Sequence, residues 1–268
     1  MPSRAVITLT TDFGYDDPFA GVMKGVMLGI NPDVEIVDIT HGIKPHDIRE
    51  AAYTIGMNYR FFPPNTIHIV VVDPGVGSGR RPVIVSAERH YFIGPDNGVF
   101  SYIYGMQPES LSVCHITAEH YFLSADSPTF QARDVFAPIA AWFSRGISLS
   151  KFGDPVNDYI SIALAIPDLS DAGMIRGEVI HIDRFGNAIT NITASELGQL
   201  SSSSADSSLR IMLRDLSVPL RKYYEQADKG SLAALMNSSG FLEFFMYEGN
   251  AALTHAIATG DSVTVSKL

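Results

Sequence analysis

The first half of the chain alternates short apolar runs with longer segments that have helical periodicity. The apolar runs are rich in β-branched residues, which favours strands, and they cover residues 5–10, 34–39, 67–72, 82–87 and 90–93. Helices are expected between them and beyond, at residues 18–30, 47–59 and 133–145. This alternation predicts an α/β domain whose sheet is largely parallel.

Two of these helices carry start signals in the sequence. Asp17 followed by Pro18 predicts an N-cap with proline at the first helical position, and Asp47 predicts the cap of the second helix.

The pattern changes after about Phe152, where prolines flank a connection and the chain becomes rich in strands. The expected strands cover residues 177–182, 209–213, 232–236, 241–245 and 262–265. The sequence therefore predicts two domains, an α/β domain at 1–165 and a small, mostly β domain at 170–268. The serine-rich stretch 201–208 predicts an exposed turn.

Charge and composition narrow the class of partner. The net charge is −10, and the only adjacent basic residues are the pairs Arg80-Arg81 and Arg221-Lys222, so we expect no nucleic-acid partner. No apolar stretch reaches the ~18 residues that a membrane span needs, and the N-terminus lacks a signal-peptide pattern. The chain has one cysteine, Cys114, which fits a reducing compartment, and we expect a cytoplasmic protein.

Polar loops follow the first and third expected strands. The first is TTDFGYDD at 10–17, and the second is VVDPGVGSGRR at 71–81. In sheets of this kind ligands bind beyond the carboxyl ends of the strands, where both loops fall. Asp12, Asp16 and Asp17 have the chemistry to hold a metal ion or sugar hydroxyls, or only to cap a helix. Asp73 and Arg80 fit an active-site pair or a structural turn.

Three further motifs lie in the second half. They are FGNAITNI at 185–192, NSSGFLE at 237–243 and GNAA at 249–252. Asn187 has an amide that can pair with the edge of a heterocycle, although Gly-Asn is also a common turn. The eight histidines show no metal-binding spacing, and neither a GxSxG nor a GxGxxG motif is present.

Taken in order, these motifs resemble one family. TTDFGxxD, VVDPGVG, GPDNG (94–98), TFxxRDxFAP (129–138), IDxFGNxxTNI (182–192) and NSSGxLE run from Ile7 to about Val265. The chain is similar to the adenosine-forming S-adenosyl-L-methionine (SAM) hydrolases, or SAM hydroxide adenosyltransferases, which are relatives of fluorinase and chlorinase. The resemblance implies an α/β N-terminal domain and a small, mostly antiparallel, β-barrel-like C-terminal domain. It also implies a homotrimer that binds SAM between neighbouring subunits, without a metal or another cofactor.

The resemblance also assigns roles to residues. The N-terminal domain would supply the ribose and catalytic loops, and the C-terminal domain would supply the adenine and methionine contacts. Asp12 would hold the ribose hydroxyls, with His46 near the ribose. The adenine side would be formed by Asn187, Phe185 and Tyr224. The methionine part would be held by Asp17, Asp183 and Ser238, and Ala251 of GNAA would complete the substrate-binding residues.

The implied reaction is hydrolysis of SAM to adenosine and methionine by in-line attack of water on C5′. The family activates that water with an Asp, an Arg and a His; Asp73 and Arg80 match the first two positions, and Gln131 replaces the third. Glutamine cannot act as a general base, although its amide can orient a water or the arginine. A SAM or adenosine binder without catalysis and a halide transferase therefore stay open as alternatives, and a metal-dependent phosphohydrolase using Asp12, Asp16 and Asp17 ranks below them.

Overall fold

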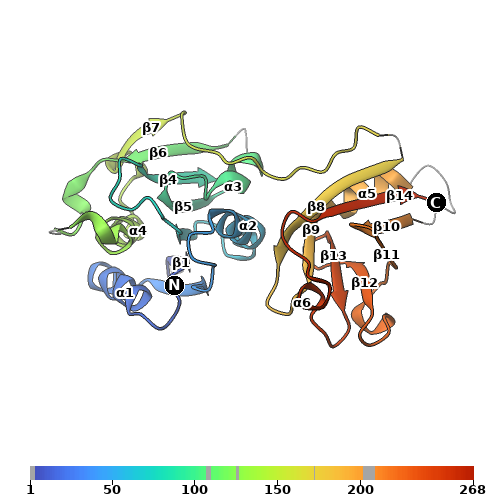
Figure 1. Ribbon diagram of the computed structural model, residues 1–268. Helices are drawn as coiled ribbons and strands as arrows, with labels where there is room; N and C mark the ends of the chain where they lie inside the picture. Colours follow the sequence, from blue (N-terminus) through green and yellow to red (C-terminus); the bar gives the residue numbers. More distant parts are fainter. Residues whose placement is uncertain (1–3, 107–109, 125–126, 172, 202–208) are drawn as a thin grey trace. The chain divides into compact units, whose positions relative to one another are not determined.

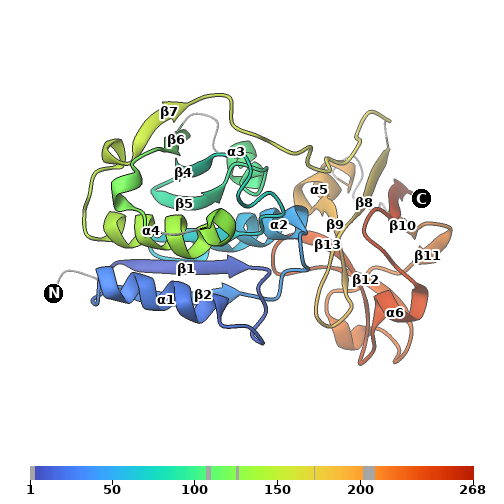
Figure 2. The ribbon, with the colours of Figure 1, turned by 60° about the vertical axis from the view of Figure 1, so that its left-hand side comes forward.

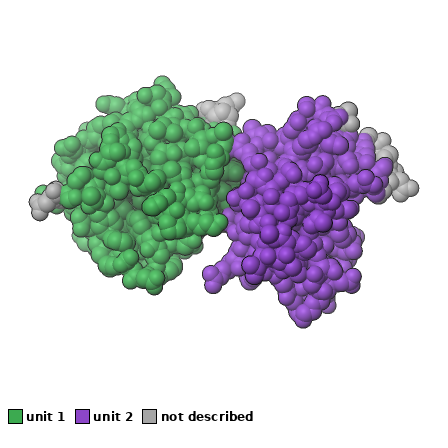
Figure 3. All heavy atoms as spheres, viewed as in Figure 1, with its two compact units in different colours: residues 1–163 green, residues 164–268 purple. Residues whose placement is uncertain are grey.

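The chain divides into two compact units, residues 1–163 and 164–268, which are green and purple in Figure 3. The computed structural model describes residues 4–106, 110–124, 127–171, 173–201 and 209–268. Most of the serine-rich stretch for which an exposed turn was predicted, residues 202–208, lies outside these ranges. Each unit is described below by itself.

The described part of unit 1 contains a seven-stranded sheet in the order β2-β1-β3-β5-β4-β6-β7 (Figure 1). Its strands are β1 (Val6–Thr11), β2 (Glu35–Thr40), β3 (Ile67–Val71), β4 (Pro82–Ala87), β5 (His90–Pro95), β6 (Ser112–Ile116) and β7 (Gly153–Val156). The run β2-β1-β3-β5 is parallel, and β4, β6 and β7 add antiparallel pairings. The predicted α/β class is confirmed.

Helices cover both faces of this sheet, because alternate residues of the central strands point to opposite faces. Ile69 joins an apolar cluster with Met23 of α1 (Phe19–Ile30) and Ala140 of α4 (Ala137–Ser144), and α1 and α4 lie side by side in Figure 2. Val70 joins a second cluster, which contains side chains of α2 (Ile48–Asn58) and α3 (Ser101–Met106). The result is a three-layer α/β/α unit.

The strand order places a ligand-binding edge next to β1. The chain runs from β1 to β2 on one side and then returns to β3 on the other side of β1. Crevices in doubly wound sheets form at this kind of reversal, beyond the carboxyl ends of the strands. Thr11 lies opposite Val71 in the β1–β3 register, so the loops that begin at Asp12 and Val72 leave the sheet at the same edge.

The helix starts agree with the sequence in one case and differ in the other. The Asp47 side chain accepts a hydrogen bond from the Glu50 amide at 2.9 Å, which confirms the predicted cap of α2. The prediction for α1 was wrong, because Pro18 occupies the N-cap position and no side chain caps the helix. Asp17 lies one residue before the N-cap position, so its carboxylate does not cap α1.

The helix expected at 133–145 consists of two parts. A wider turn with π-helical hydrogen bonds covers Ala132–Phe136, and α4 continues from Ala137 to Ser144. Pro138 lacks an amide hydrogen, so it fits the first turn of α4. Bulges of this kind occur frequently at functional sites, and this one directly follows Gln131.

Unit 2 is built on a second seven-stranded sheet, counted over its described residues, in the order β11-β10-β14-β8-β9-β13-β12. Its strands are β8 (Met174–Ile182), β9 (Ala188–Thr193), β10 (Leu209–Leu213), β11 (Leu216–Val218), β12 (Leu232–Met236), β13 (Phe241–Met246) and β14 (Ser262–Lys267). All neighbours pair antiparallel. Just beyond β11, Leu220 bridges to Ala234 of β12, and this contact nearly closes the sheet into a barrel. The predicted barrel-like domain is confirmed.

Short elements complete the two units. Unit 1 has single 3₁₀ turns at Tyr59–Phe61, Glu119–Tyr121, Pro128–Phe130 and Leu149–Lys151. Unit 2 has helices α5 (Ala194–Ser201) and α6 (Ala251–His255) and a 3₁₀ turn at Tyr224–Gln226. In the described part of the chain, no helix combines the length and the apolarity needed to cross a bilayer.

A buried histidine pair lies in the sheet of unit 1. The Nδ1 atom of His68 lies 2.7 Å from the Thr8 hydroxyl, and its Nε2 atom lies 3.2 Å from Nδ1 of His90. The His68 ring is fully buried and stacks on Phe92. Burial, together with the neighbouring His90, lowers the pKa of His68 to about 3.

This pKa predicts that acid destabilises unit 1. The folded-state pKa of His68 lies below the unfolded value of about 6.5. The stability that the neutral ring contributes to the folded state is therefore complete above pH 6.5 and is lost as pH falls toward 3. We expect the free energy of unfolding to fall by up to about 1.4 kcal/mol per pH unit through this group. Urea unfolding at pH 7 and pH 5 tests this. The double variant Thr8→Val/His68→Phe should have a shallower pH dependence, and an unchanged slope would contradict the assignment.

Candidate active site

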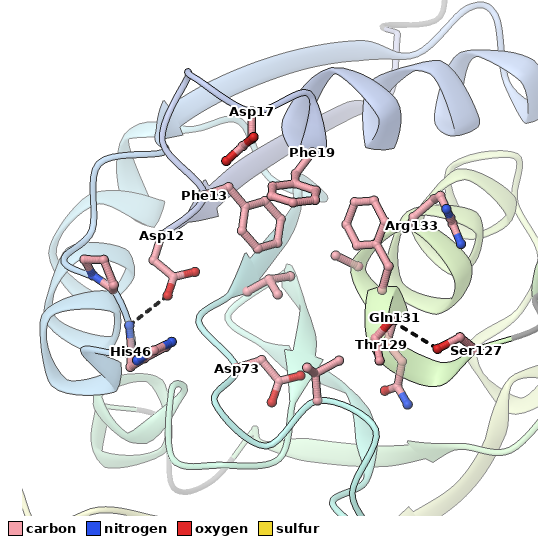
Figure 4. Close-up of a pocket in the computed structure, with 15 residues that line it drawn as sticks. Asp12, Phe13, Asp17, Phe19, His46, Asp73, Ser127, Thr129, Gln131 and Arg133 are labelled. Carbon is pink, nitrogen blue, oxygen red and sulfur yellow. Dashed lines mark hydrogen bonds between the residues drawn. The ribbon is translucent and has the colours of Figure 1, made fainter.

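A pocket of ≈ 840 Å³ opens at the carboxyl ends of β1 and β3 (Figure 4). Four chain segments line it: the loop after β1 with the start of α1, the loop after β2, the end of β3 with the loop after it, and the stretch around the π-helical turn. The predicted site residues that it brings together are Asp12, Asp17, His46, Asp73 and Gln131.

The loop after β1 holds Asp12 by a backbone hydrogen bond. The amide of His46 donates to Oδ2 of Asp12 at 2.8 Å. His46 has a φ angle of 68°, a left-handed conformation that is uncommon for residues other than glycine. The surrounding structure maintains this unusual conformation, in which the His46 amide points toward the Asp12 carboxylate.

A chain of polar side chains holds the end of β1 in place behind Asp12. The Thr11 hydroxyl lies 2.7 Å from Nδ1 of His41, a fully buried residue. His41 Nε2 is 3.1 Å from Oδ1 of Asp38, and Lys24 donates to Oδ2 of Asp38 at 2.6 Å. Burial raises the pKa of Asp38, but the hydrogen bonds from Lys24 and His41 outweigh it and hold this pKa below its usual value.

Three aromatic rings form an apolar wall of the pocket. The ring centroids of Phe13, Phe19 and Phe130 are 5.2–6.2 Å apart, and two of the three contacts are edge-to-face. The Arg133 guanidinium lies over the Phe130 ring at 5.0 Å. Asp17 stands beside this wall in Figure 4, so the pocket places a carboxylate next to an apolar surface.

Asp73 and Arg80 form a bidentate ion pair at the pocket wall. Arg80 Nε donates to Oδ1 of Asp73 at 2.8 Å, and Nη2 pairs with Oδ2. The two side chains are only 5% and 8% exposed, so both charges depend on each other for solvation. The Arg80 guanidinium also lies over the Phe136 ring. The pair therefore has one defined geometry.

Two polar atoms near this pair are buried without a partner among the described residues. They are Nη1 of Arg80, a donor, and Oε1 of Gln131, an acceptor. Gly77 of the Asp73 loop has a φ of 78° and approaches the Pro128 carbonyl, which brings the two segments together. Because buried polar atoms are normally satisfied, each of these two has the capacity to bond a small polar ligand such as water.

The GPDNG motif at residues 94–98 holds the loop that carries Asp73 through side-chain hydrogen bonds. Asn97 donates from its side chain to the Val72 carbonyl at 2.9 Å, one residue before Asp73. Asp96 accepts from both Nε and Nη2 of Arg81, next to Arg80. Gly94 packs against the Val70 carbonyl so closely that a Cβ atom would lie 2.3 Å from it. The motif thus acts as a support for the ion pair.

Unit 2 has a separate, open pocket of ≈ 570 Å³ that contains Asp183, Phe185, Asn187 and Tyr224. Oδ1 of Asp183 accepts from the amides of Phe185 and Asn187, and its Oδ2 accepts from the Asn187 side chain. A carboxylate only accepts, so this contact orients the Asn187 amide. The remaining N–H and the oxygen of that amide are left to pair with a ligand.

Two predicted residues of unit 2 do not line this pocket. Ala251 is fully buried at the start of α6, while its neighbours Gly249 and Asn250 do line the pocket. Ser238 lies in the turn between β12 and β13 and is exposed. The FGN loop reaches α6 through a hydrogen bond from the Ala252 amide to the Gly186 carbonyl.

Comparison with known proteins identifies the family. The family described as SAM hydroxide adenosyltransferase matches with its N-terminal domain over residues 7–153 and with its C-terminal domain over residues 177–264. The chain belongs to the SAM hydroxide adenosyltransferase family.

Its relatives cover nearly the full chain. A protein named (R)-S-adenosyl-L-methionine hydrolase from Methanocaldococcus jannaschii is 34% identical over 92% of this chain and 90% of its own length. A crystal structure of an uncharacterized conserved protein from Thermotoga maritima has a TM-score of 0.89 and 32% identity, covering 97% of this chain and 99% of that one. A fluorinase from Actinoplanes is 27% identical over the full length of both chains.

Several pocket residues of this family member were missed by the sequence analysis. They are Phe13, Phe19, Pro45, Val71, Val76, Ser127, Thr129, Phe130, Ala132 and Arg133. Phe13, Val76 and Phe130 lie inside motifs that were noted, but an apolar residue in a motif does not reveal whether it faces the core or a pocket. Phe19 is the first residue of α1 and has no such signal.

The carboxylates of the first loop do not form the metal cluster considered from the sequence. Within the described ranges, no three His, Cys, Asp or Glu side chains are placed to hold a metal ion. Asp12 is bonded to the His46 amide, and Asp17 faces the pocket beside the phenylalanine rings. The carboxylates are therefore arranged singly, as they would be for separate polar groups of one ligand.

The ion pair yields a prediction on stability. Arg80→Met leaves the Asp73 carboxylate buried without its partner, so unit 1 should lose about 3–5 kcal/mol of its free energy of unfolding. The double variant Asp73→Asn/Arg80→Met removes both charges and should recover much of this loss. Urea unfolding measures both variants, and a cost below about 1 kcal/mol for Arg80→Met would show that the pair is solvated.

Proposed function

We propose that this protein hydrolyses SAM to adenosine and L-methionine by in-line attack of water on C5′. Membership of the SAM hydroxide adenosyltransferase family supports this, together with the relative named (R)-S-adenosyl-L-methionine hydrolase. The observation that carries the proposal is the buried Asp73–Arg80 pair, because Asp73 lines the same pocket as Gln131, whose buried Oε1 has no partner among the described residues.

The nucleophilic water would bind beside Asp73. One of its O–H groups donates to the Asp73 carboxylate and the other donates to Gln131 Oε1, while Arg80 fixes the carboxylate through Nε and Nη2. Asp73 takes up the first of these protons as the O–C5′ bond forms, and the second stays on the 5′-hydroxyl of adenosine. The C5′–S bond breaks at the same time, and its electron pair returns to sulfur as the thioether of methionine.

Gln131 changes the proton route without removing the water site. Its amide oxygen can orient a water but cannot take up a proton near neutral pH, so the proton must go to Asp73 or to solvent. The sulfonium is already a good leaving group. Positioning the water in line with C5′ can therefore supply most of the acceleration, about 7–11 kcal/mol in favourable cases.

The polar groups of both units fit the parts of SAM. Asp12 would accept from the two ribose hydroxyls, with His46 beside the ribose. Asp17 would hold the methionine amine, and Asp183 and Ser238 would complete the contacts to the amino acid end. On the adenine side, the free half of the Asn187 amide matches the ring edge, which has one donor and one acceptor.

The adenine ring would pack on Phe185 and Tyr224, whose side chains are 74% and 45% exposed. Apolar rings this exposed favour burial against a second surface. We therefore also propose the homotrimer, with SAM bound between neighbouring subunits. The cytoplasm is the compartment proposed, which suits the single buried thiol of Cys114.

Product analysis tests the reaction. Purified protein with SAM should give adenosine and methionine in equal amounts, and added chloride should change neither product, because Asp73 repels an anion at the nucleophile position. Chlorinated adenosine would assign the protein to halide transfer. Bound but intact SAM would show a protein that binds without catalysis.

Asp73→Asn should lower kcat by at least about 100-fold and leave the dissociation constant for SAM within a few-fold, because the residue acts on water. Asp16→Asn is the matched control, since this carboxylate lies in the first loop but does not line the pocket. Chromatographic turnover assays and calorimetry measure the two quantities. Parent-level turnover in Asp73→Asn would exclude this role.

The side chain at 131 should set the pH profile. Gln131 does not titrate, so kcat of the parent protein should show no limb that depends on this residue. Gln131→His introduces a base that works only when neutral, and kcat should then rise with pH through about 6.5. Gln131→Ala should lower kcat by about tenfold or more. If Gln131→Ala turned over as fast as the parent, the water site would lie elsewhere.

A further inference from the structure

Glu243 is a carboxylate buried inside unit 2, and neither the reaction nor the pocket lining explains it. It lies on β13 and is 4% exposed. Burial raises its pKa, while hydrogen bonds from Asn237 and Tyr224 act against that rise. Burying a carboxylate costs free energy unless its oxygens accept hydrogen bonds. The two hydrogen-bond partners of Glu243 therefore indicate its role.

The two oxygens of Glu243 bond to two different segments. The Tyr224 hydroxyl donates to Oε1 at 2.9 Å, and the Asn237 side chain donates to Oε2 at 3.1 Å. Tyr224 lines the pocket, and its ring also meets Phe245 edge-to-face. Asn237 begins the turn that carries Ser238. The Glu243 carboxylate thus joins Tyr224 to the turn that carries Ser238.

The partner at 237 cannot turn its amide around. Its Oδ1 atom accepts from the amides of Ser239 at 3.0 Å and Phe241 at 3.1 Å, so its Nδ2 atom must face Glu243. Tyr224 also presents a donor, and this contact, after burial, raises the pKa of the Tyr224 hydroxyl to about 12. The site thus presents a fixed donor from Asn237 and the hydroxyl donor of Tyr224, and the two oxygens of the carboxylate accept from both.

We propose that Glu243 is a positioning residue for SAM, which fixes the Tyr224 ring and the Ser238 turn in one geometry. The inference rests on the proposed function, in which Tyr224 contacts adenine and Ser238 contacts the methionine end. Glu243 touches no ligand and lies outside the unit that carries Asp73, so it governs how tightly the substrate binds. The chemical step depends on other residues.

The test compares a variant that loses both hydrogen bonds with one that keeps them. Glu243→Leu removes both acceptors, so the group that joins Tyr224 to Asn237 is lost. Glu243→Gln can keep both bonds, because its amide oxygen accepts from Asn237 and its NH₂ donates to the Tyr224 hydroxyl, which can also accept. Glu243→Leu should raise the KM for SAM about tenfold with kcat changed less than about threefold, and Glu243→Gln should keep KM within about threefold of the parent value.

The control is Glu196→Gln, which weakens a side-chain bond to Thr193 at the start of α5 in the same unit. It should lower the melting temperature without raising KM. A Glu243→Leu protein with lower kcat and unchanged KM, or a Glu243→Gln protein whose KM rises as far as that of Glu243→Leu, would overturn the proposal. Tyr224→Phe keeps the ring but loses the bond, and it should raise KM in the same direction.

Binding measured directly separates this proposal from the proposed function. Calorimetry with SAM and with adenosine should show that Glu243→Leu weakens both by about tenfold, and that Glu243→Gln stays within about threefold of the parent. If the parent protein bound SAM without cleaving it, the hydrolase proposal would fail, while these binding constants would still decide the role of Glu243. Equal affinities in the parent and Glu243→Leu would overturn that role.

Discussion

The buried ion pair between Asp73 and Arg80 is the constraint on which the rest of the site depends. Two nearly inaccessible charges are tolerated only with full pairing, so the loop between them has one conformation. The GPDNG motif holds that loop through Asn97, and Gly77 brings it against the segment that carries Gln131. Arg80 commits Nε and Nη2 to Asp73, and Asp73 lines the pocket in which the nucleophile is proposed to bind.

The fold could be predicted to a large extent because its strands are apolar and its turns are marked. The strands from β1 to β5 follow the β-branched runs, and the Asp47 cap was read from local chemistry. The predictions that failed concern features that depend on tertiary contacts. Pro18 took the cap position expected for Asp17, and the π-helical turn at 132–136 has no periodic signature that separates it from an α-helix. Short elements such as β7 and β11 are too brief for any pattern to emerge.

The candidate site was predictable where its residues carry charge. Asp12, Asp17, Asp73 and Gln131 follow from the motifs, and the pocket brings them together. Phe19 could not be found, since the direction of a side chain from a helix start depends on packing. The sequence also held no sign that the Tyr224 hydroxyl bonds Glu243, because these residues become neighbours only after folding. Family resemblance supplied roles that local chemistry left open.

Turnover in ¹⁸O-labelled water, followed by mass spectrometry, tests most directly whether a water molecule held beside Asp73 attacks C5′ of SAM. Attack by this water predicts one ¹⁸O atom in the 5′-hydroxyl of adenosine and none in methionine, with loss of this product in Asp73→Asn. Label in homoserine together with methylthioadenosine would place the attack on the amino acid chain, and adenosine without label would exclude water as the nucleophile.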